Sequence, residues 1–359
     1  MNNRILLIIG SFKTGGAERV TINTGSELQK RGFDVYYALQ KNVIELPNHI
    51  AKDKIYILRK SDSQSKLYKI YALFVGIFLV RLKVRPKVVI GFSRLSSFLA
   101  CFTLCSRVIA RFDANPYRLS RKQHIYANFI FAWPFVRKII VPSSGMYKAI
   151  SAVKPAKKDK LMVIPNTIDV SKVIGLSQHA PDRHFNFKFI CAMGRLSHDK
   201  NFELLIQAYH DSEIRKHYKL VIIGDGKLRG KLEKMVDDLA LKEDVLFPGF
   251  MNNPYPIVKQ AEFLVNSSRN ESFCNVILEG LTLSLPVIAT DCDYGPADMI
   301  RNDENGFLIE TNSVPALVNI LDRIADDKSV LTKFRLNAGA SVKEFELSNV
   351  IEKWISLLV

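Results

Sequence analysis

The segment AEFLVNSSRNESFCNVILEG, residues 261–280, contains the alternation that decides the fold. Its first part, AEFLVNSS, is apolar and short, which predicts a buried β-strand rather than a helix. A polar loop follows, and apolar residues return near Asn275 or Val276 with helical spacing. A buried strand that leads through a loop into a helix is the repeating unit of α/β proteins.

The same unit recurs along the chain. RILLIIGS, residues 4–11, precedes a helical pattern that ends at Gly32. We expect further strands at DVYYALQ, KIYIL, KVVIGFS, RVIARF and KIIVPS in the first half, and at KFICAMG, KLVIIGDG, VLFPGF, PVIATD and GFLIE in the second. Helices are expected between them, for example over residues 201–210 and 228–241. Two such series predict two Rossmann-like domains with parallel sheets.

A length of 359 residues agrees with two domains, each large enough for its own core. We expect an N-terminal domain over residues 1–170 and a C-terminal domain over residues 171–340. The boundary is placed in the polar segment 170–187, which lacks clear periodicity and contains Pro181. The last segment, 341–359, is expected to be mostly helical and to pack back on the N-terminal domain.

The positive charge is concentrated in the first half. Residues 1–170 hold 29 Lys and Arg against 9 Asp and Glu, whereas residues 171–359 hold 22 against 26. Such a half attracts an anionic partner: a phosphorylated substrate, an anionic membrane or nucleic acid. We expect no nucleic acid, because the sequence has no zinc-finger spacing, aromatic RNA-binding signature or basic helix with heptads.

Two segments of this basic half are candidates for membrane contact. Residues 66–87 and 121–138 each place apolar and aromatic residues between cationic ends. Both are too short to span a bilayer, so each is either a core helix or a helix at an anionic lipid surface. The five scattered cysteines predict buried free thiols, and no secretory signal is evident. A cytoplasmic protein, peripheral on the inner face of the membrane, is expected.

Glu271 and Glu279 raise the question of a catalytic carboxylate pair. Eight residues of helix rise about 12 Å, whereas glycosidase carboxylates lie roughly 5 to 9.5 Å apart. If the helix begins at Asn275 or Val276, Glu271 lies in the preceding loop and Glu279 about one turn into the helix. A helix N-terminus binds phosphate, so both carboxylates are expected to hold hydroxyls of a phosphorylated ligand.

Two further loops follow strands. GRLSHDKN, residues 194–201, offers Arg195 and Lys200 as a clamp for a diphosphate. GSFKTGGAER, residues 10–19, has neither the Walker nor the dinucleotide spacing, but Gly15 and Gly16 permit close approach of a ligand. The DCD triplet at residues 291–293 lacks further ligands nearby, so we expect no metal site and no cofactor.

Taken together, these residues resemble the retaining glycosyltransferases of family 4, which have the GT-B fold of two facing Rossmann-like domains. The matching motifs are TGGAER, PNTID, GRLSHDKN, IGDG, VLFPGF, ESFCNVILE followed by GLTLSLPVIATDCDYGP, and NGFLI. They occur in order from residue 10 to about residue 310.

The resemblance implies roles for these residues. Arg195 and Lys200 would hold the diphosphate of a nucleotide sugar, and Glu271 the hydroxyls of its sugar. Phe250 would lie near the base, and Glu279 would accept from the ribose. The remaining donor-binding positions implied by the family motifs are Gly15, Gly16, Gly194, Phe273, Cys274 and Asn275.

Two positions depart from the family pattern. Where members commonly carry a histidine, this chain reads ARFDANP, and Asp113 is the nearest match, which makes it a further candidate catalytic residue. The common EGFP is ESFC here, with Ser272 and Cys274. The shape of the pocket around the donor sugar is therefore expected to differ.

The resemblance is strongest to bacterial enzymes that build surface polysaccharide: O-antigen, capsule or lipopolysaccharide core. It implies transfer of a hexose or N-acetylhexosamine from a nucleotide diphosphate sugar, with UDP the expected carrier, to a lipid-linked or lipopolysaccharide acceptor. Retention of configuration without a metal is implied as well. Two alternatives remain open: a nucleotide-sugar 2-epimerase of the same fold, and a noncatalytic protein that binds anionic surfaces.

Overall fold

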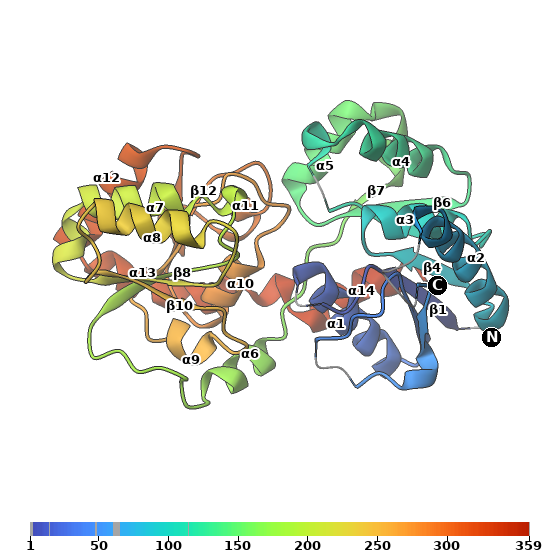
Figure 1. Ribbon diagram of the computed structural model, residues 1–359, viewed down its shortest axis with the longest axis horizontal. Helices are drawn as coiled ribbons and strands as arrows, with labels where there is room; N and C mark the ends of the chain where they lie inside the picture. The colour runs from blue at the N-terminus through green and yellow to red at the C-terminus, as the bar shows by residue number, and fades with distance from the viewer. Residues whose placement is uncertain (1–2, 14, 47–48, 60–64, 114, 359) are drawn as a thin grey trace. The chain divides into compact units, whose positions relative to one another are not determined.

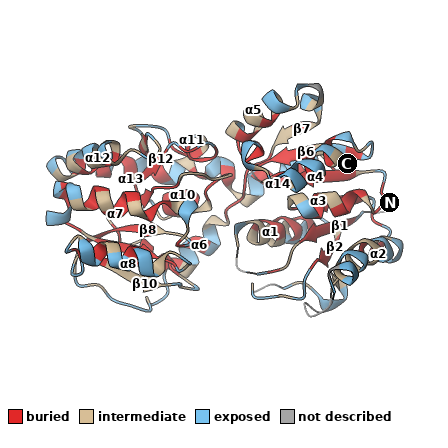
Figure 2. Ribbon diagram, turned by 45° about the horizontal axis from the view of Figure 1, so that its top comes forward, coloured by how far each residue is buried: buried red, intermediate tan, exposed pale blue. Residues whose placement is uncertain are grey.

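The computed structural model describes residues 3–13, 15–46, 49–59, 65–113 and 115–358, and the chain forms two compact units. Unit 1 comprises Met1–Thr167 together with Leu347–Val359, and unit 2 comprises Ile168–Glu346. In both units most strand residues are buried, and the outward sides of the helices are largely exposed (Figure 2). Among the described residues, no helix has the length and apolar character that crossing a membrane requires.

Unit 1 is built on a seven-stranded parallel sheet with the order β3-β2-β1-β4-β5-β6-β7. Four of these strands, β1, β4, β6 and β7, are labelled in Figure 1. The strands are β1 Arg4–Ile9, β2 Asp34–Leu39, β3 Ile55–Ile57, β4 Val88–Gly91, β5 Val108–Arg111, β6 Val136–Val141 and β7 Leu161–Val163. The helices are α1 Gly16–Lys30, α2 Lys66–Val84, α3 Arg94–Cys101, α4 Arg121–Ala132, α5 Ser144–Val153 and α14 Leu347–Ile355.

The C-terminal helix α14 supplies part of the core of unit 1. Its residues Val350, Ile351 and Trp354 are fully buried beside residues of β1 and α1. The Trp354 indole stacks on the Phe92 ring with 5.5 Å between the centroids. Unit 1 therefore combines residues from two distant parts of the chain.

Unit 2 is built on a six-stranded parallel sheet with the order β10-β9-β8-β11-β12-β13. The strands are β8 Phe189–Met193, β9 Lys219–Ile223, β10 Val245–Gly249, β11 Leu264–Asn266, β12 Val287–Thr290 and β13 Gly306–Ile309. The helices are α6 Val170–Ser177, α7 Phe202–Asp211, α8 Arg229–Asp238, α9 Tyr255–Val258, α10 Asn275–Thr282, α11 Pro296–Met299, α12 Val314–Asp326 and α13 Ser329–Ser341.

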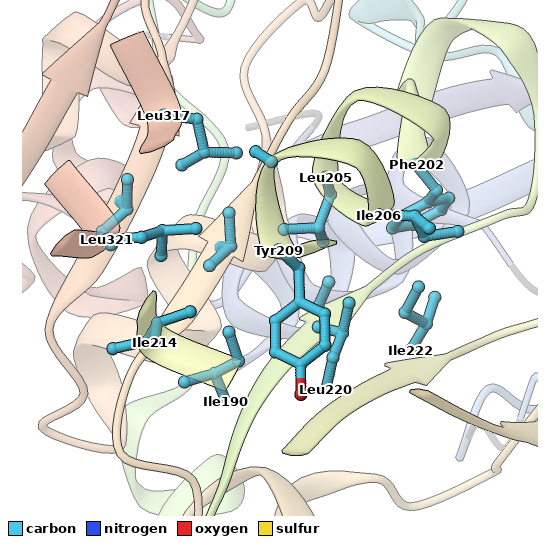
Figure 3. Close-up of a cluster of buried hydrophobic side chains, with 14 of the residues drawn as sticks. Ile190, Phe202, Leu205, Ile206, Tyr209, Ile214, Leu220, Ile222, Leu317 and Leu321 are labelled. Atoms are coloured by element: carbon cyan, nitrogen blue, oxygen red, sulfur yellow. The ribbon is translucent and has the colours of Figure 1, made fainter. Parts of the chain in front are cut away.

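Alternate residues of the strands in unit 2 enter separate cores on the two faces of the sheet. Ile190 packs with α7, α8 and α12, whereas its neighbour Cys191 packs with α6, α9 and α10. In the first core, Tyr209 of α7 lies among apolar side chains (Figure 3) and donates a 2.8 Å hydrogen bond to the carbonyl of Tyr218. Burying a side chain such as the fully buried Leu205 contributes about 1.5–3 kcal/mol.

The expected fold class is confirmed, because every strand expected from the sequence is present and all the strand pairs are parallel. Several elements were not expected from the sequence. They include β7, three residues at the edge of its sheet, and α6, in a segment judged aperiodic. The helices α12 and α13, which follow the last strand, were not expected either. The segment expected to be helical from residue 341 begins its last α-helix only at Leu347.

The segment 66–87 forms α2 as far as Val84, and only part of the helix is buried. Ile77 and Val84 are inside, but Leu67 is 81% exposed and Leu79 is 58% exposed. The alternative of a core helix that is enclosed on all sides is therefore wrong for this segment. The second segment, 121–138, is helical only to Ala132, and its last residues lie in β6.

Candidate functional site

The order of strands in unit 2 creates a switch point between β8 and β11. These strands are neighbours, but the chain continues from β8 to β9 on one side and from β11 to β12 on the other. In open α/β sheets, the loops at the carboxyl ends of such strands diverge and leave a crevice for ligands. The two loops here are residues 194–201 and residues 267–274.

An ion pair joins these two loops. The ammonium nitrogen of Lys200 lies 2.5 Å from Oε1 of Glu271, and the same oxygen accepts a 2.8 Å hydrogen bond from the Ser268 hydroxyl. The side chains of Lys200 and Glu271 are only 20% and 13% exposed. A charge-assisted bond at this depth is stronger than a surface ion pair, so it fixes both side chains.

Hydrogen bonds to backbone carbonyls hold the two loops together. Ser267 donates through its hydroxyl to the carbonyl of Lys200, at 3.0 Å. The backbone N–H of Arg269 donates to the carbonyl of Asp199 at 2.7 Å, and its guanidinium donates to the carbonyl of His198 at 2.8 Å. The position of Lys200 relative to Glu271 is therefore set by several independent bonds.

The charge of Lys200 is maintained by its partner. Burial lowers the pKa of Lys200, but attraction by Glu271 and the hydrogen bond to it outweigh this, and the pKa is raised overall. Burial raises the pKa of the nearby Cys274 well above its usual value, and the Glu271 charge adds to this effect. Burial likewise raises the pKa of Cys292 to about 12. Both cysteines therefore remain neutral thiols near neutral pH, and Lys200 supplies a positive charge here.

Ser268 links Glu271 to the end of β11. Its single hydroxyl proton has two acceptors in reach, Glu271 at 2.8 Å and Oδ1 of Asn266 at 3.0 Å. The amide nitrogen of Asn266 is buried with no hydrogen-bond partner in the described part of the chain. Turning the amide would let Asn266 donate to Ser268 while Ser268 donates to the carboxylate, because the two ends of an amide are assigned from their partners.

Glycines let the loops approach one another. Gly224, after β9, has a φ of +142°, and a Cβ there would lie 1.9 Å from the carbonyl oxygen of Gly194. Gly295, before α11, has a φ of +107°, and a Cβ there would lie 2.1 Å from the carbonyl oxygen of Phe273. Only glycine fits positions that combine positive φ with such close backbone contact.

Helix α10 begins beside the ion pair. Cys274 precedes it in the left-handed conformation, with a φ of 74°, and Asn275 is its first residue. Glu271 thus lies in the loop and Glu279 in the helix, which confirms their expected placement relative to the helix start. The N-terminal end of a helix attracts anions, and that of α10 lies close to Lys200, whose charge interacts with Cys274.

Three other candidates of unit 2 differ in accessibility. Arg195 is exposed and forms no hydrogen bond or ion pair within the described ranges, so its guanidinium is available to a ligand. Phe250, after β10, is 58% exposed. Phe273 is buried against Phe345, with 5.7 Å between the ring centroids, so only its backbone is available to a ligand.

The remaining candidates belong to unit 1. Gly15 caps the N-terminus of α1, and Gly16 is the first residue of that helix, while residue 14 of the TGGAER motif lies outside the described residues. Asp113 follows β5, and burial raises the pKa of its carboxyl group, partly offset by the positive charges of Arg111 and Arg94.

Two residues of unit 2 that contact this site, Asn266 and Ser268, were not predicted from the sequence. Their only signal was that polar residues end a buried strand.

Two family models match consecutive parts of the chain. Residues 14–172 match the family described as Glycosyltransferase Family 4, and residues 179–341 match the family described as Glycosyl transferases group 1. The two matches together cover most of the chain. The chain therefore belongs to the glycosyltransferases that combine these two domains.

Two relatives come from Campylobacter jejuni. The N-acetylgalactosamine-N,N'-diacetylbacillosaminyl-diphospho-undecaprenol 4-alpha-N-acetylgalactosaminyltransferase is 34% identical over 188 residues, which are 52% of this chain and half the length of that relative. An alpha-1,4-N-acetyl-D-galactosaminyltransferase, whose name specifies a GalNAc-containing saccharide on PP-undecaprenol, is 24% identical over 370 residues. That alignment covers 99% of this chain and 98% of the relative.

The fold also matches solved structures. Anabaena HepE, crystallised with UDP and glucose, superposes with a TM-score of 0.80 at 17% identity, over 99% of each chain. This likeness confirms the expected GT-B class of fold, with its two Rossmann-like domains.

Proposed function

We propose that this chain is a retaining glycosyltransferase that moves a hexose or N-acetylhexosamine from a UDP-sugar to a lipid-linked or lipopolysaccharide saccharide. The observation that carries the proposal is the contact between Lys200 and Glu271 beside the start of α10. It places a cation, a carboxylate and helix N–H groups at one switch point. Those are the groups that a nucleotide diphosphate sugar requires.

The proposed chemistry follows from the charges. When the bond between the sugar and the diphosphate breaks, negative charge develops on the leaving phosphate. Lys200, the available guanidinium of Arg195 and the N–H groups of α10 stabilise this charge without having to move into place. Glu271 binds hydroxyls of the donor sugar, and Glu279 binds those of the ribose. We propose that no metal is needed, because these groups supply the positive charge.

Retention of configuration and the type of acceptor are parts of the same proposal. The acceptor hydroxyl would attack from the side that the leaving diphosphate occupies, and its proton would pass to that phosphate. The two relatives from Campylobacter jejuni are named for undecaprenol-linked saccharides, which supports a lipid-linked acceptor. Uridine is supported by the UDP in the HepE crystals.

We also propose that unit 1 binds an anionic membrane surface through α2, on the cytoplasmic face. The exposed apolar side chains of this helix include Leu67, Tyr71 and Leu79, and its last turn carries Arg81 and Lys83. Exposed apolar groups beside cations are typical of helices that lie at the interface of anionic lipids. The surface would bring the enzyme to a lipid-linked acceptor.

A panel of nucleotide sugars tests the enzymatic part of the proposal. We expect one or a few UDP-sugars to raise the melting temperature of the purified chain, because a ligand that binds the folded state stabilises it. The same donors should release UDP slowly in the absence of acceptor, and the anomer of the transferred sugar is read by NMR. An inverted product would refute retention, and donor epimerised at C2 would establish the epimerase alternative.

A further inference from the structure

Two arginines lie at the carboxyl edge of the sheet in unit 1. Arg111 is the last residue of β5, and Arg94 is the first residue of α3, just after β4. Since β4 and β5 are adjacent strands, their carboxyl ends bring these residues to the same edge. The switch point of this sheet lies next to them, because β1 and β4 are neighbours although the chain continues from β1 to β2.

Arg111 is unusually deep for a charged side chain. It is only 2% exposed, and its Nη2 donates to Oδ1 of Asn166. Its Nη1 is buried and has no hydrogen-bond partner within the described ranges. Nη1 of Arg94 is also buried without such a partner. Two guanidinium groups thus keep donors that the described chain does not satisfy.

Aromatic rings cover the faces of both guanidinium groups. Cζ of Arg111 lies 6.0 Å from the centroid of the Phe92 ring, and Cζ of Arg94 lies 5.8 Å from that of Phe112. A guanidinium forms hydrogen bonds along its edges, in the plane of the group, so a ring over its face does not block them. The edge donors are therefore the ones available to a partner.

The nearest negative charge does not neutralise the pair. Asp113 attracts both arginines, but it forms no ion pair with either of them. Burial lowers the pKa of Arg111 to about 10, so the group remains charged near neutral pH. A buried charge without an ion pair is costly, and proteins generally supply it with a counterion. The cluster keeps a net positive charge with Asp113 included.

We propose that Arg94 and Arg111, with the amide of Asn166 holding Arg111 in place, form a binding site for a phosphate group. Two forked cations with free edge donors match the oxygens of a phosphate. The site lies in unit 1 and uses none of the residues assigned to donor binding in unit 2. It also explains why a chain with so many exposed cations buries one of its arginines.

The phosphate could come from either of two sources. One is the diphosphate of the nucleotide sugar, and the other is the phosphate of a lipid-linked acceptor. The second source rests on the proposed function, whereas the site itself does not. Inorganic pyrophosphate is a probe for both, because it presents the shared chemistry without base, sugar or lipid.

Calorimetric titration of the full chain tests the proposal. Pyrophosphate is titrated into the protein with and without saturating UDP, and UDP is titrated separately. The variants are Arg94→Gln and Arg111→Gln, and Lys148→Gln removes the same charge from an exposed position on α5 as a control. Circular dichroism checks the fold of each variant. Arg94→Gln alone is sufficient if Arg111→Gln fails to fold.

Loss of one charge-assisted contact should weaken phosphate binding by about tenfold or more. If pyrophosphate binds the UDP-loaded protein and the arginine variants lose that binding, the site serves the acceptor. If UDP excludes pyrophosphate and the variants weaken UDP binding, the site serves the donor. The proposal is wrong if folded Arg94→Gln binds both ligands as the native chain and Lys148→Gln do. None of these measurements requires transferase activity.

Discussion

Nζ of Lys200 lies 2.5 Å from Oε1 of Glu271, although 71 residues separate the two in the chain. The contact joins the loop after β8 to the loop after β11, at the point where the order of the sheet reverses. The cation proposed to bind the diphosphate and the carboxylate proposed to bind the sugar are thus in direct contact. A change in either side chain should therefore affect both tasks.

Replacement of Lys200 tests its proposed role toward the leaving group. We expect Lys200→Ala to lower kcat by roughly a hundredfold or more, as loss of a preorganised charge-stabilising group does in other enzymes. Lys200→Arg should retain part of the rate, because the charge remains. The control is Lys231→Ala, which breaks an exposed ion pair with Glu203. An unchanged rate of UDP release in Lys200→Ala would remove the residue from the mechanism.

The loop packing predicts a severe effect of one methyl group. Gly224→Ala should destabilise the chain by about 1–3 kcal/mol or more, since the residue would need a strained φ and would collide with the Gly194 carbonyl. Gly230→Ala is the matched control, because its added methyl group lies in open space in α8. Urea unfolding should show that variant to be equal to or more stable than the native chain. Equal stability of the two variants would contradict the packing described.

The buried thiol of Cys191 predicts a dependence of stability on alkaline pH. Burial raises its pKa from an ordinary 9.0 to about 12. The unfolded chain ionises this thiol near pH 9.0 while the folded chain keeps the proton, so its contribution to stability is complete below that pH. It is lost as the pH rises toward about 12.

Comparison with Cys191→Ala isolates this contribution. The free energy of unfolding of the native chain should fall more steeply between about pH 8 and about pH 10.5 than that of the variant. Urea unfolding at several pH values measures both slopes. Part of the slope should remain in Cys191→Ala, because burial also raises the pKa of Cys101 to about 12. Identical slopes would contradict the prediction, because they would mean that the pKa of Cys191 is the same in the folded and the unfolded chain.

The exposed face of α2 predicts binding to anionic vesicles. Sedimentation with phosphatidylglycerol vesicles should be strong at low salt and should weaken as salt screens the attraction. Leu67→Ser combined with Leu79→Ser should reduce binding by about tenfold or more, because apolar surface is lost from the interface. Leu336→Ser is the control, since Leu336 of α13 is 80% exposed in unit 2. Equal loss of binding in the control would show that the effect is not specific to α2.

The sequence was sufficient to predict the fold because strand, loop and helix signals are local. Buried runs such as RILLIIGS and KLVIIGDG can be recognised without any long-range information. The strand β7 was missed because three residues at a sheet edge carry too little apolar signal. Helix α6 was missed although Asp169 accepts from the N–H of Lys172 as an N-cap, because eight residues are too few for clear periodicity.

The site was predictable only in part. Arg195, Lys200 and Glu271 could be proposed from the sequence because charged residues follow buried strands, but their contacts depend on which strands are neighbours. The bond from Ser268 to Glu271 has no signature in the sequence, since a serine in a loop is common. The same holds for Arg111 and Asn166, which lie 55 residues apart. Burial of an arginine cannot be inferred from its position after a strand.

The core that encloses Trp354 has a consequence for the order of events during synthesis. Unit 2 is one continuous stretch, Ile168–Glu346, so it can complete its fold as soon as it has left the ribosome. Unit 1 starts first but needs α14, whose Trp354, Val350 and Ile351 close its core. We therefore expect the apolar surface of unit 1 that packs against α14 to stay uncovered until the whole of unit 2 has been translated. The half of the protein that is made first is the half that matures last.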